Sequence, residues 1–359
     1  MRDRLRICLV ASSLYPIGEP FAGGLEAMTH QLARELLRRG HEVSLFAAPG
    51  SDPALDVTEL DVPRFVPSPA AEADVNAPPR RWMAEHHAYL GLMLDLARDA
   101  STRFDVVHNN SLHHLPVAMA HTVDVPLVTT LHTPPVPWLE SAVALSPASS
   151  SFAAVSEHTS RAWAHLAPAV PILNGVDVDR WTPGPGGGPA VWSGRLVAEK
   201  APHEAIDACR LAGIPLVLAG PVPDEAYFER EIAPRLGRQA VHVGHLDHKA
   251  LTRLLGRASV ALVTPAWDEP YGLVAAEAMA CGTPVAAYDR GALREVVADE
   301  AGALAPGGDV EALAVAVTAA LGLDRGAVRR HAVQHCSLRR MVDEYERLYR
   351  SLGRLRDAA

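Results

Sequence analysis

Short apolar runs alternate with amphipathic stretches along the first half of the chain. Residues 5–11 form an apolar run of strand length, residues 25–37 carry apolar side chains at helical spacing, and residues 43–48 form the next run. Gly40 ends the helix between them. This order predicts a strand–helix–strand unit with parallel strands and a right-handed crossover. The same pattern predicts strands at 105–108, 126–132, 153–156 and 170–173, and a helix at 157–166.

A second alternation of strands and helices begins at residue 190. The predicted strands are 190–193, 215–219, 241–243, 259–264 and 284–288, and the predicted helices are 200–212, 225–236, 247–256, 272–280, 309–321 and 338–352. Residues 183–189, Pro-Gly-Pro-Gly-Gly-Gly-Pro, predict a linker or long loop, and residues 50–80 predict an irregular loop. The chain is therefore predicted to form two doubly wound α/β halves that join near residue 180.

The charge of the chain is acidic and unevenly distributed. The formal net charge is −9, and residues 1–182 contribute −7 of it, with 13 arginines against 20 carboxylates. Binding to nucleic acid or to anionic lipid requires clustered Lys and Arg. The composition therefore argues against both partners.

The four cysteines show neither metal-ligand spacing nor a disulfide framework. The apolar run near the start is too short for a signal-peptide core, and nowhere do 18 apolar residues follow one another. We expect a soluble protein of the cytoplasm without stable membrane association. The sequence does not indicate an oligomeric state.

Two glycines, Gly23 and Gly24, open the first predicted helix. The dinucleotide fingerprint GxGxxG is absent between this helix and the strand before it. Free backbone N–H groups at a helix entrance nevertheless suit a phosphate or a substrate oxygen. The alternative is a plain turn.

Two glutamates, Glu269 and Glu277, lie eight residues apart after the strand predicted at 259–264. The carboxyl end of that strand presents Glu269 at the edge where α/β sheets bind ligands. Residues 270–272 then open a helix whose first N–H groups are unpaired, and Glu277 lies about two turns inside it. From there a carboxylate can reach a sugar hydroxyl of a bound nucleotide. The alternative is two solvent-facing carboxylates.

The segment Ser193-Gly194-Arg195-Leu-Val-Ala-Glu-Lys200 follows a strand and opens a helix. A guanidinium and an ammonium five residues apart, beside a glycine, suit a diphosphate. Lys200 is one of two lysines in a chain with 33 basic residues. The alternative is plain surface charge.

These segments together resemble the retaining, nucleotide-sugar-dependent glycosyltransferases of family 4, which have the GT-B architecture of two Rossmann-like domains facing a central cleft. The resemblance covers most of the chain in the family's order, and the length is similar to that of actinobacterial transferases that modify small natural products. The matching stretches are Gly23-Gly-Leu-Glu26, Leu131-His-Thr133, Ala154-Val-Ser156, Asn174-Gly-Val-Asp177, Gly194-Arg-Leu-Val-Ala-Glu-Lys200, Leu218-Ala-Gly-Pro221, Val243-Gly244 and Glu269-Pro-Tyr-Gly-Leu-Val-Ala-Ala-Glu-Ala-Met279.

The resemblance implies a role for each matching residue on the donor side. Arg195 and Lys200 neutralise the donor diphosphate, Glu277 accepts hydrogen bonds from the ribose, and Glu269 holds hydroxyls of the donor sugar. Gly194 and the N–H groups of Tyr271, Gly272 and Leu273 complete this cradle, and Gly23 and Gly24 approach the phosphates from the other domain.

The resemblance also implies a catalytic set and an acceptor side. His132, Glu269, Arg195 and Lys200 form the expected catalytic set, with His132 beside the anomeric carbon and the acceptor. A core histidine at a strand end is the alternative for His132. The candidates for acceptor binding are Glu26, His108, Asn109, His132 and Trp138. For His108, Asn109 and Trp138 the alternative is that they simply pack.

No metal ion or other cofactor is implied. Asp177-Val-Asp179 imitates a metal-binding DxD motif but falls where an interdomain turn is expected. The pairs His86-His87 and His113-His114 lack the spacing of a known metal site, and we expect structural or solvent-facing roles for them.

The sequence thus predicts an acceptor-side domain at residues 1–176, a nucleotide-sugar domain at 177–335, and a last helix at 336–359 that crosses back to the first domain. The expected reaction moves a hexose or N-acetylhexosamine from a nucleotide sugar, with UDP as the expected base, to a small soluble acceptor, as in natural-product or antibiotic biosynthesis. A sugar-nucleotide epimerase or phosphorylase of the same fold, or a non-catalytic sugar-nucleotide sensor, is the alternative.

Overall fold

The computed structural model describes residues 4–60, 62 and 65–357. The chain divides into two compact units. The first contains the described residues up to Val155, then Thr159–Ile172 and the chain from Val342 onward. The second contains Ser156–His158 and Leu173–Met341. After the short segment Ser156–His158, the chain crosses from the first unit to the second between residues 172 and 173. This point lies four residues before the domain boundary that the sequence predicts.

The first unit is built on a seven-stranded parallel sheet with the strand order β3-β2-β1-β4-β5-β6-β7. The order reverses between β1 and β4, as the doubly wound prediction requires. The central strands are buried on both faces, which explains why their sequences are largely continuous apolar runs. The strands are β1 (Arg6–Val10), β2 (Glu42–Ala47), β3 (Val57–Glu59), β4 (Val106–Asn109), β5 (Leu127–Leu131), β6 (Ser151–Ala154) and β7 (Val170–Pro171).

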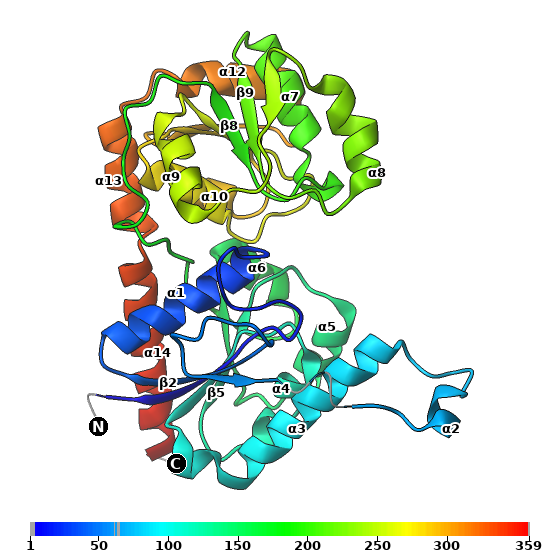
Figure 1. Ribbon diagram of the computed structural model, residues 1–359. Coiled ribbons are helices and arrows are strands. Elements are labelled where there is room, and N and C mark those ends of the chain that lie inside the picture. The colour runs from blue at the N-terminus through cyan, green and yellow to red at the C-terminus, as the bar shows by residue number, and fades with distance from the viewer. Residues whose placement is uncertain (1–3, 61, 63–64, 358–359) are drawn as a thin grey trace. The chain divides into compact units, whose positions relative to one another are not determined.

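Helices cover this sheet, and one of them stands out by its length (Figure 1). Helix α3 spans 24 residues and packs Tyr89, Leu92, Met93 and Leu96 into the core. The interval 50–80, predicted to be irregular throughout, also contains β3 and a short helix. The helices of the first unit are α1 (Gly24–Arg38), α2 (Pro69–Glu72), α3 (Arg80–Arg103), α4 (His114–Ala118), α5 (Pro137–Ala144) and, from Thr159 onward, α6 (Glu157–Trp163).

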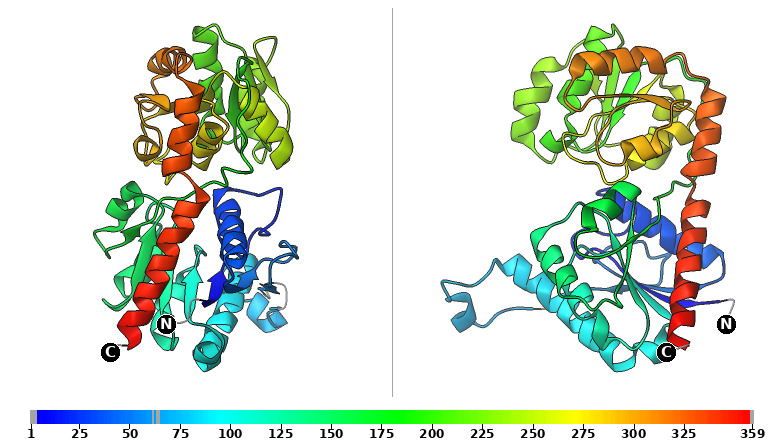
Figure 2. Two further views of the ribbon diagram at one scale, coloured as in Figure 1. Left: turned by 90° about the vertical axis from the view of Figure 1, so that its left-hand side faces the viewer. Right: turned by 180° about the vertical axis from the view of Figure 1, so that it is seen from behind.

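The last helix, α14 (Leu338–Asp357), contributes its residues from Val342 onward to the first unit (Figure 2). Glu346 Oε1 lies 3.1 Å from His41 Nε2, and the Tyr345 hydroxyl lies 3.0 Å from Thr130 Oγ1. Both contacts are buried. Polar side chains of α14 are therefore fixed in the interior of the first unit.

The second unit is built on a six-stranded parallel sheet with the order β10-β9-β8-β11-β12-β13. Its order reverses between β8 and β11. Both units are thus Rossmann-like, which confirms the predicted GT-B fold class. The strands are β8 (Ala190–Ser193), β9 (Leu216–Ala219), β10 (Ala240–His242), β11 (Ala261–Val263), β12 (Val285–Tyr288) and β13 (Gly302–Ala305).

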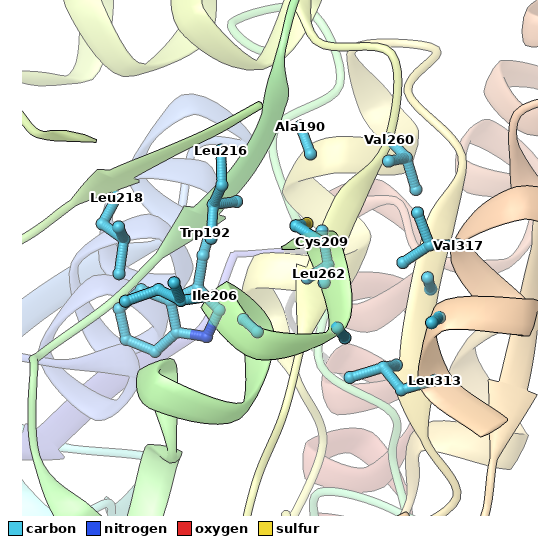
Figure 3. Close-up of a cluster of buried hydrophobic side chains, with 14 of the residues drawn as sticks. Ala190, Trp192, Ile206, Cys209, Leu216, Leu218, Val260, Leu262, Leu313 and Val317 are labelled. Carbon is cyan, nitrogen blue, oxygen red and sulfur yellow. The ribbon is translucent and has the colours of Figure 1, made fainter. Parts of the chain in front are cut away.

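Helices α7 and α12 cover one face of this sheet, and their apolar side chains meet those of β8, β9 and β11 (Figure 3). Trp192, Leu218, Ile206 and Leu313 are all buried there. The helix predicted at 225–236 is divided into α8, a π-helical turn and a 3₁₀ turn. The helices are α7 (Pro202–Leu211), α8 (Glu225–Tyr227), α9 (His248–Arg257), α10 (Leu273–Ala280), α11 (Leu293–Val296), α12 (Val310–Ala320) and α13 (Arg325–His335).

The glycine- and proline-rich stretch 183–189 is an ordered loop of the second unit. The N–H of Gly186 donates to the carbonyl of Gly256 over 2.9 Å, and the N–H of Gly188 donates to the carbonyl of Arg257 over 2.8 Å. This stretch packs against the end of α9 because its small residues allow close backbone approach.

All four cysteines are buried free thiols. None of the helices that the structure describes combines the length and the apolar character needed to cross a bilayer.

Candidate active site

The candidate donor site lies at the carboxyl edge of the second sheet, where the strand order reverses. Ser193 ends β8 and Gly194 follows it, and Thr264 follows β11. Ligands of doubly wound sheets bind at this edge beside the reversal point. The pocket found there is lined by Trp192, Ser193, Gly194, Lys200, Leu262, Val263, Thr264, Pro265, Glu269 and Val274.

Gly194 allows the chain to turn tightly at the end of β8. Its φ of +148° lies in a region that favours glycine, and a Cβ on the neighbouring Gly220 would lie 1.7 Å from the carbonyl oxygen of Gly194. The two loops that follow β8 and β9 therefore approach each other backbone to backbone.

Lys200 ends a 3₁₀ turn (Ala198–Lys200), and the next residue, Ala201, adopts a left-handed conformation with φ 42° and ψ 50°. Thr264 stabilises this turn from the neighbouring strand. Its hydroxyl lies 2.9 Å from the carbonyl oxygen of Lys200 and 3.1 Å from that of Ala201, and it accepts a hydrogen bond from the indole N–H of Trp192. The turn that presents Lys200 is thus fixed by side chains from both central strands.

Lys200 and Glu269 form an ion pair inside the pocket. Lys200 Nζ lies 2.5 Å from Glu269 Oε2, and the Lys200 side chain is 26% exposed against 13% for Glu269. The same ammonium lies 5.2 Å from the ring centroid of Trp267. The site therefore holds a cation that is partly desolvated and already oriented by a carboxylate and an aromatic face.

The backbone of Glu269 is held by the loop after β12. The carbonyl of Glu269 accepts from the N–H of Ala292 over 2.8 Å. Gly291 has a φ of +64°, and a Cβ at this position would lie 2.2 Å from that carbonyl oxygen. Only glycine fits between the loop and Glu269.

Helix α10 begins directly after this segment, with Gly272 as its N-cap residue. Its first backbone hydrogen bond runs from the N–H of Ala275 to the carbonyl of Gly272. The N–H groups of Leu273 and Val274 precede this bond and have no acceptor within the helix. The resemblance names the N–H groups of Tyr271, Gly272 and Leu273 for this role, and the side chain of Tyr271 is buried.

Glu277 lies in α10, partly buried among small apolar residues. Desolvation raises the pKa of its carboxyl group to about 8. The group therefore carries a proton at neutral pH and can donate a hydrogen bond as well as accept one. The resemblance implies acceptance alone.

Arg195 is placed differently from Lys200. Its side chain is 47% exposed, it lies 3.7 Å from Glu199, and it is not among the residues that line the pocket. The structure thus brings Gly194, Lys200 and Glu269 together and leaves Arg195 on the surface of the same segment.

In the first unit, Gly23 caps α1 in an extended conformation and Gly24 begins the helix. Glu26 is buried in the first turn, and a Cβ on Gly23 would lie 3.2 Å from Glu26 Oε2. The Glu26 carboxylate thus lies beside the entrance of its own helix.

His132 follows β5 and is buried. Its Nε2 lies 3.0 Å from Asn110 Oδ1, and desolvation lowers the pKa of the imidazole to about 3. His132 is therefore neutral at physiological pH, and if Nε2–H donates to Asn110, Nδ1 is the acceptor nitrogen.

Two acceptor candidates lie in the interior of the first unit. His108 is fully buried, with Nδ1 2.7 Å from the Tyr349 hydroxyl and Nε2 2.7 Å from Thr130 Oγ1. The Asn109 carboxamide is engaged by Thr129 and Ser111. With their polar atoms already engaged, neither is retained in the acceptor set. Trp138, in contrast, is 58% exposed at the start of α5.

The two carboxylates that imitate a metal motif do not converge on a metal position. Asp177 Oδ1 accepts from the N–H of Asp179, and the Asp179 carboxylate pairs with Arg339.

The sequence indicates no role for Thr264, Trp267 or Gly291, and it does not indicate that Asn110 contacts His132. Thr264 and Trp267 flank the segment that was singled out for Glu269, and Asn110 belongs to the polar run after β4. Gly291 gave no signal, because its role depends on a contact between distant loops.

Two family profiles and several known proteins match the chain. The profile described as Glycosyltransferase Family 4 matches residues 22–180, and the one described as Glycosyl transferases group 1 matches residues 189–334. A glycogen synthase of Mycobacterium tuberculosis is 33% identical, covering 91% of this chain and 88% of its own length. A phosphatidyl-myo-inositol mannosyltransferase of Mycobacterium leprae is 28% identical over 84% of each protein.

Solved structures show the same fold. AviGT4, a glycosyltransferase involved in avilamycin A biosynthesis, has a TM-score of 0.71 at 24% identity, covering 97% of this chain and 98% of its own. Sucrose-phosphate synthase from Thermosynechococcus elongatus has a TM-score of 0.74 at 22% identity, covering 97% and 99%. The chain belongs to glycosyltransferase family 4 and is a retaining, nucleotide-sugar-dependent glycosyltransferase with the GT-B fold.

Proposed function

We propose that the protein transfers a hexose or N-acetylhexosamine from a UDP-sugar to a small soluble acceptor, without a divalent metal. The main support for a donor site in the second unit is the Lys200–Glu269 ion pair, which lies where the strand order of the second sheet reverses. The choice of UDP over GDP or ADP rests on the resemblance to the family.

The donor diphosphate is proposed to bind along Gly194, Lys200 and the first turn of α10. When the glycosyl–phosphate bond breaks, its electron pair goes to the diphosphate, which gains negative charge. Lys200 and the N–H groups of Leu273 and Val274 stabilise this charge, because they are fixed in a partly desolvated pocket before the reaction starts. Arg195, on the surface of the same segment, reaches the diphosphate by a change of rotamer.

Glu269 is proposed to have two functions. Before donor binding its carboxylate orients the Lys200 ammonium, and in the complex it accepts hydrogen bonds from hydroxyls of the donor sugar. Glu277 bonds the ribose. Neither carboxylate is proposed as a nucleophile.

The acceptor oxygen is proposed to attack the anomeric carbon from the side on which the diphosphate leaves, and the acceptor proton passes to the leaving phosphate oxygen. Attack on that face retains the anomeric configuration. Neutral His132, oriented by Asn110, is proposed to contact the acceptor, with Trp138 and Glu26 as further candidates.

The acidic first half of the chain, at −7, supports a soluble and uncharged or cationic acceptor, such as an aminocyclitol of natural-product biosynthesis, over an anionic lipid. A second candidate acceptor is an α-glucan, because the 33% identical relative is named glycogen synthase.

The experiment is a transfer assay with UDP-, GDP- and ADP-sugars, each against aminocyclitols, a maltooligosaccharide and anionic phosphoinositide vesicles, with and without EDTA. We expect EDTA-insensitive transfer from a UDP-sugar to a soluble amino-containing acceptor. Elongation of the maltooligosaccharide supports the second candidate instead, and transfer only to vesicles overturns the acceptor assignment. Donor epimerisation, phosphorolysis, or binding without turnover of any acceptor favours the non-transferase alternatives.

A further inference from the structure

Three histidine side chains converge in the first unit, at a place that the donor chemistry does not use. His86 belongs to α3, and His113 and His114 lie at the start of α4. One ring nitrogen of each lies within 4.8 Å of the corresponding nitrogen of the other two. Helices α3 and α4 lie side by side (Figure 1).

We propose that His86, His113 and His114 form a binding site for a divalent transition metal of the zinc type. Imidazole nitrogens are the ligands that Zn²⁺, Cu²⁺ and Ni²⁺ share, whereas Mg²⁺ and Ca²⁺ prefer oxygen. Three protein ligands leave a fourth position of a tetrahedral zinc ion for water or another small ligand.

An unsatisfied polar atom supports a bound ion. His86 Nδ1 is buried and has no hydrogen-bond partner among the described residues. A buried imidazole nitrogen without a partner is unfavourable unless something binds it. A metal ion at this position would satisfy it.

The surroundings are aromatic. Trp82 stacks on His86 at a centroid distance of 5.2 Å, and Tyr89 stacks on His113 at 4.4 Å. Tyr89 is itself fixed by its hydroxyl, which donates to the carbonyl of Ala11. This shell limits the rotamers of the ligands and the access of water.

Metal binding requires a small rearrangement. Ligand atoms of a tetrahedral zinc ion lie about 3.4 Å apart, given Zn–N bonds of about 2.0–2.1 Å, so the ring nitrogens must approach one another by up to about 1.4 Å. His113 Nδ1 also accepts a 3.2 Å hydrogen bond from the N–H of Leu115. His113 would keep this hydrogen bond if it bound the metal through Nε2, and would lose it if it bound through Nδ1.

The site is independent of the proposed metal-free transfer. Its three ligands belong to the first unit, whereas Lys200, Glu269 and Glu277 belong to the second. A metal ion bound by the three histidines would link the first half of α3 to the turn after β4. It replaces the expectation, drawn from spacing alone, that these histidines are only structural or solvent-facing.

The test uses untagged full-length protein, stripped with EDTA and desalted. Zn²⁺ is titrated in competition with a chromogenic chelator, and Co²⁺ is added separately to record visible d–d absorption. We expect one Zn²⁺ per chain and a Co²⁺ spectrum of low coordination number. His86→Gln and His114→Gln should each weaken Zn²⁺ binding by at least about 100-fold.

His87→Gln is the matched control, because His87 is the neighbouring exposed histidine on α3. It should leave both affinity and spectrum unchanged. Circular dichroism melts of the metal-free variants show that each one folds, and the Zn²⁺-dependent increase in melting temperature should vanish only in the ligand variants. Binding that is equally strong in all variants, or absent from the wild type, overturns the proposal and leaves a packed cluster of neutral aromatic rings.

Discussion

The ammonium of Lys200 and the carboxylate of Glu269 lie 2.5 Å apart, although 69 positions separate them in the sequence. Each follows one of the two central strands of the second sheet. The strand order therefore brings a cation and an anion together at the edge where the donor is expected to bind.

Replacing Lys200 with alanine should lower kcat/KM for the donor by about 10²–10³-fold, because a preorganised cation facing the leaving diphosphate is lost. The measurement is initial rate against donor concentration. Lys249→Ala is the control, since Lys249 is the other lysine of the chain and is exposed on α9. Equal rates for the two variants would remove Lys200 from the mechanism.

Thr264→Val should raise KM for the donor and destabilise the second unit by about 1–3 kcal/mol, because the carbonyls of Lys200 and Ala201 and the indole of Trp192 lose their partner. Thr264→Ser keeps the hydroxyl and should restore most of the KM. Chemical denaturation and donor kinetics on both variants provide the check. If serine fails to restore KM, the methyl group rather than the hydroxyl is what the site requires.

The sequence and the structure agree where local pattern determines structure. The apolar runs predicted β8 and β9 closely, because strands buried on both faces are continuous in sequence. The same patterns placed Lys200 and Glu269 after the central strands. Their pairing could not be predicted from spacing, because it depends on the strand order.

Other features depended on tertiary contacts. His108 was expected at a strand end as an acceptor-binding residue, yet it is buried, and its Nδ1 lies 2.7 Å from the hydroxyl of Tyr349, more than 200 residues away on α14. Helix α13 was missed because its exposed, basic sequence has little apolar periodicity. Strand β13, Gly-Ala-Leu-Ala, was missed because small residues carry no strand signal outside their sheet.

Glu277 should make stability depend on pH. Its pKa is raised from 4.5 to about 8, so the folded protein holds a proton that the unfolded chain has released. The free energy of unfolding of the wild type relative to Glu277→Gln should therefore decrease as pH rises from about 4.5 to about 8, with a slope of at most about 1.4 kcal/mol per pH unit. Urea denaturation at several pH values measures it. A difference that is constant with pH would mean that the carboxyl group is solvated.

His132 should act as a neutral group. Because its pKa is lowered to about 3, His132 should cause no inflection near pH 6.5 in the pH profile of the transfer rate. His132→Ala should therefore leave the shape of the profile in that range unchanged. His132→Ala should reduce kcat by about 10²-fold and leave the affinity for the nucleotide unchanged. Asn110→Leu should reproduce part of this loss, since it removes the partner that orients the ring. A parallel loss of nucleotide affinity would instead point to a folding defect.

The most direct test of the donor site is isothermal titration calorimetry of UDP, GDP and ADP binding to the wild type and to Lys200→Ala, with and without EDTA. The account predicts that UDP binds, that EDTA has no effect, and that Lys200→Ala weakens binding at least about tenfold while Lys249→Ala does not. Binding that requires a divalent metal, or that is as strong in Lys200→Ala as in the wild type, would contradict it.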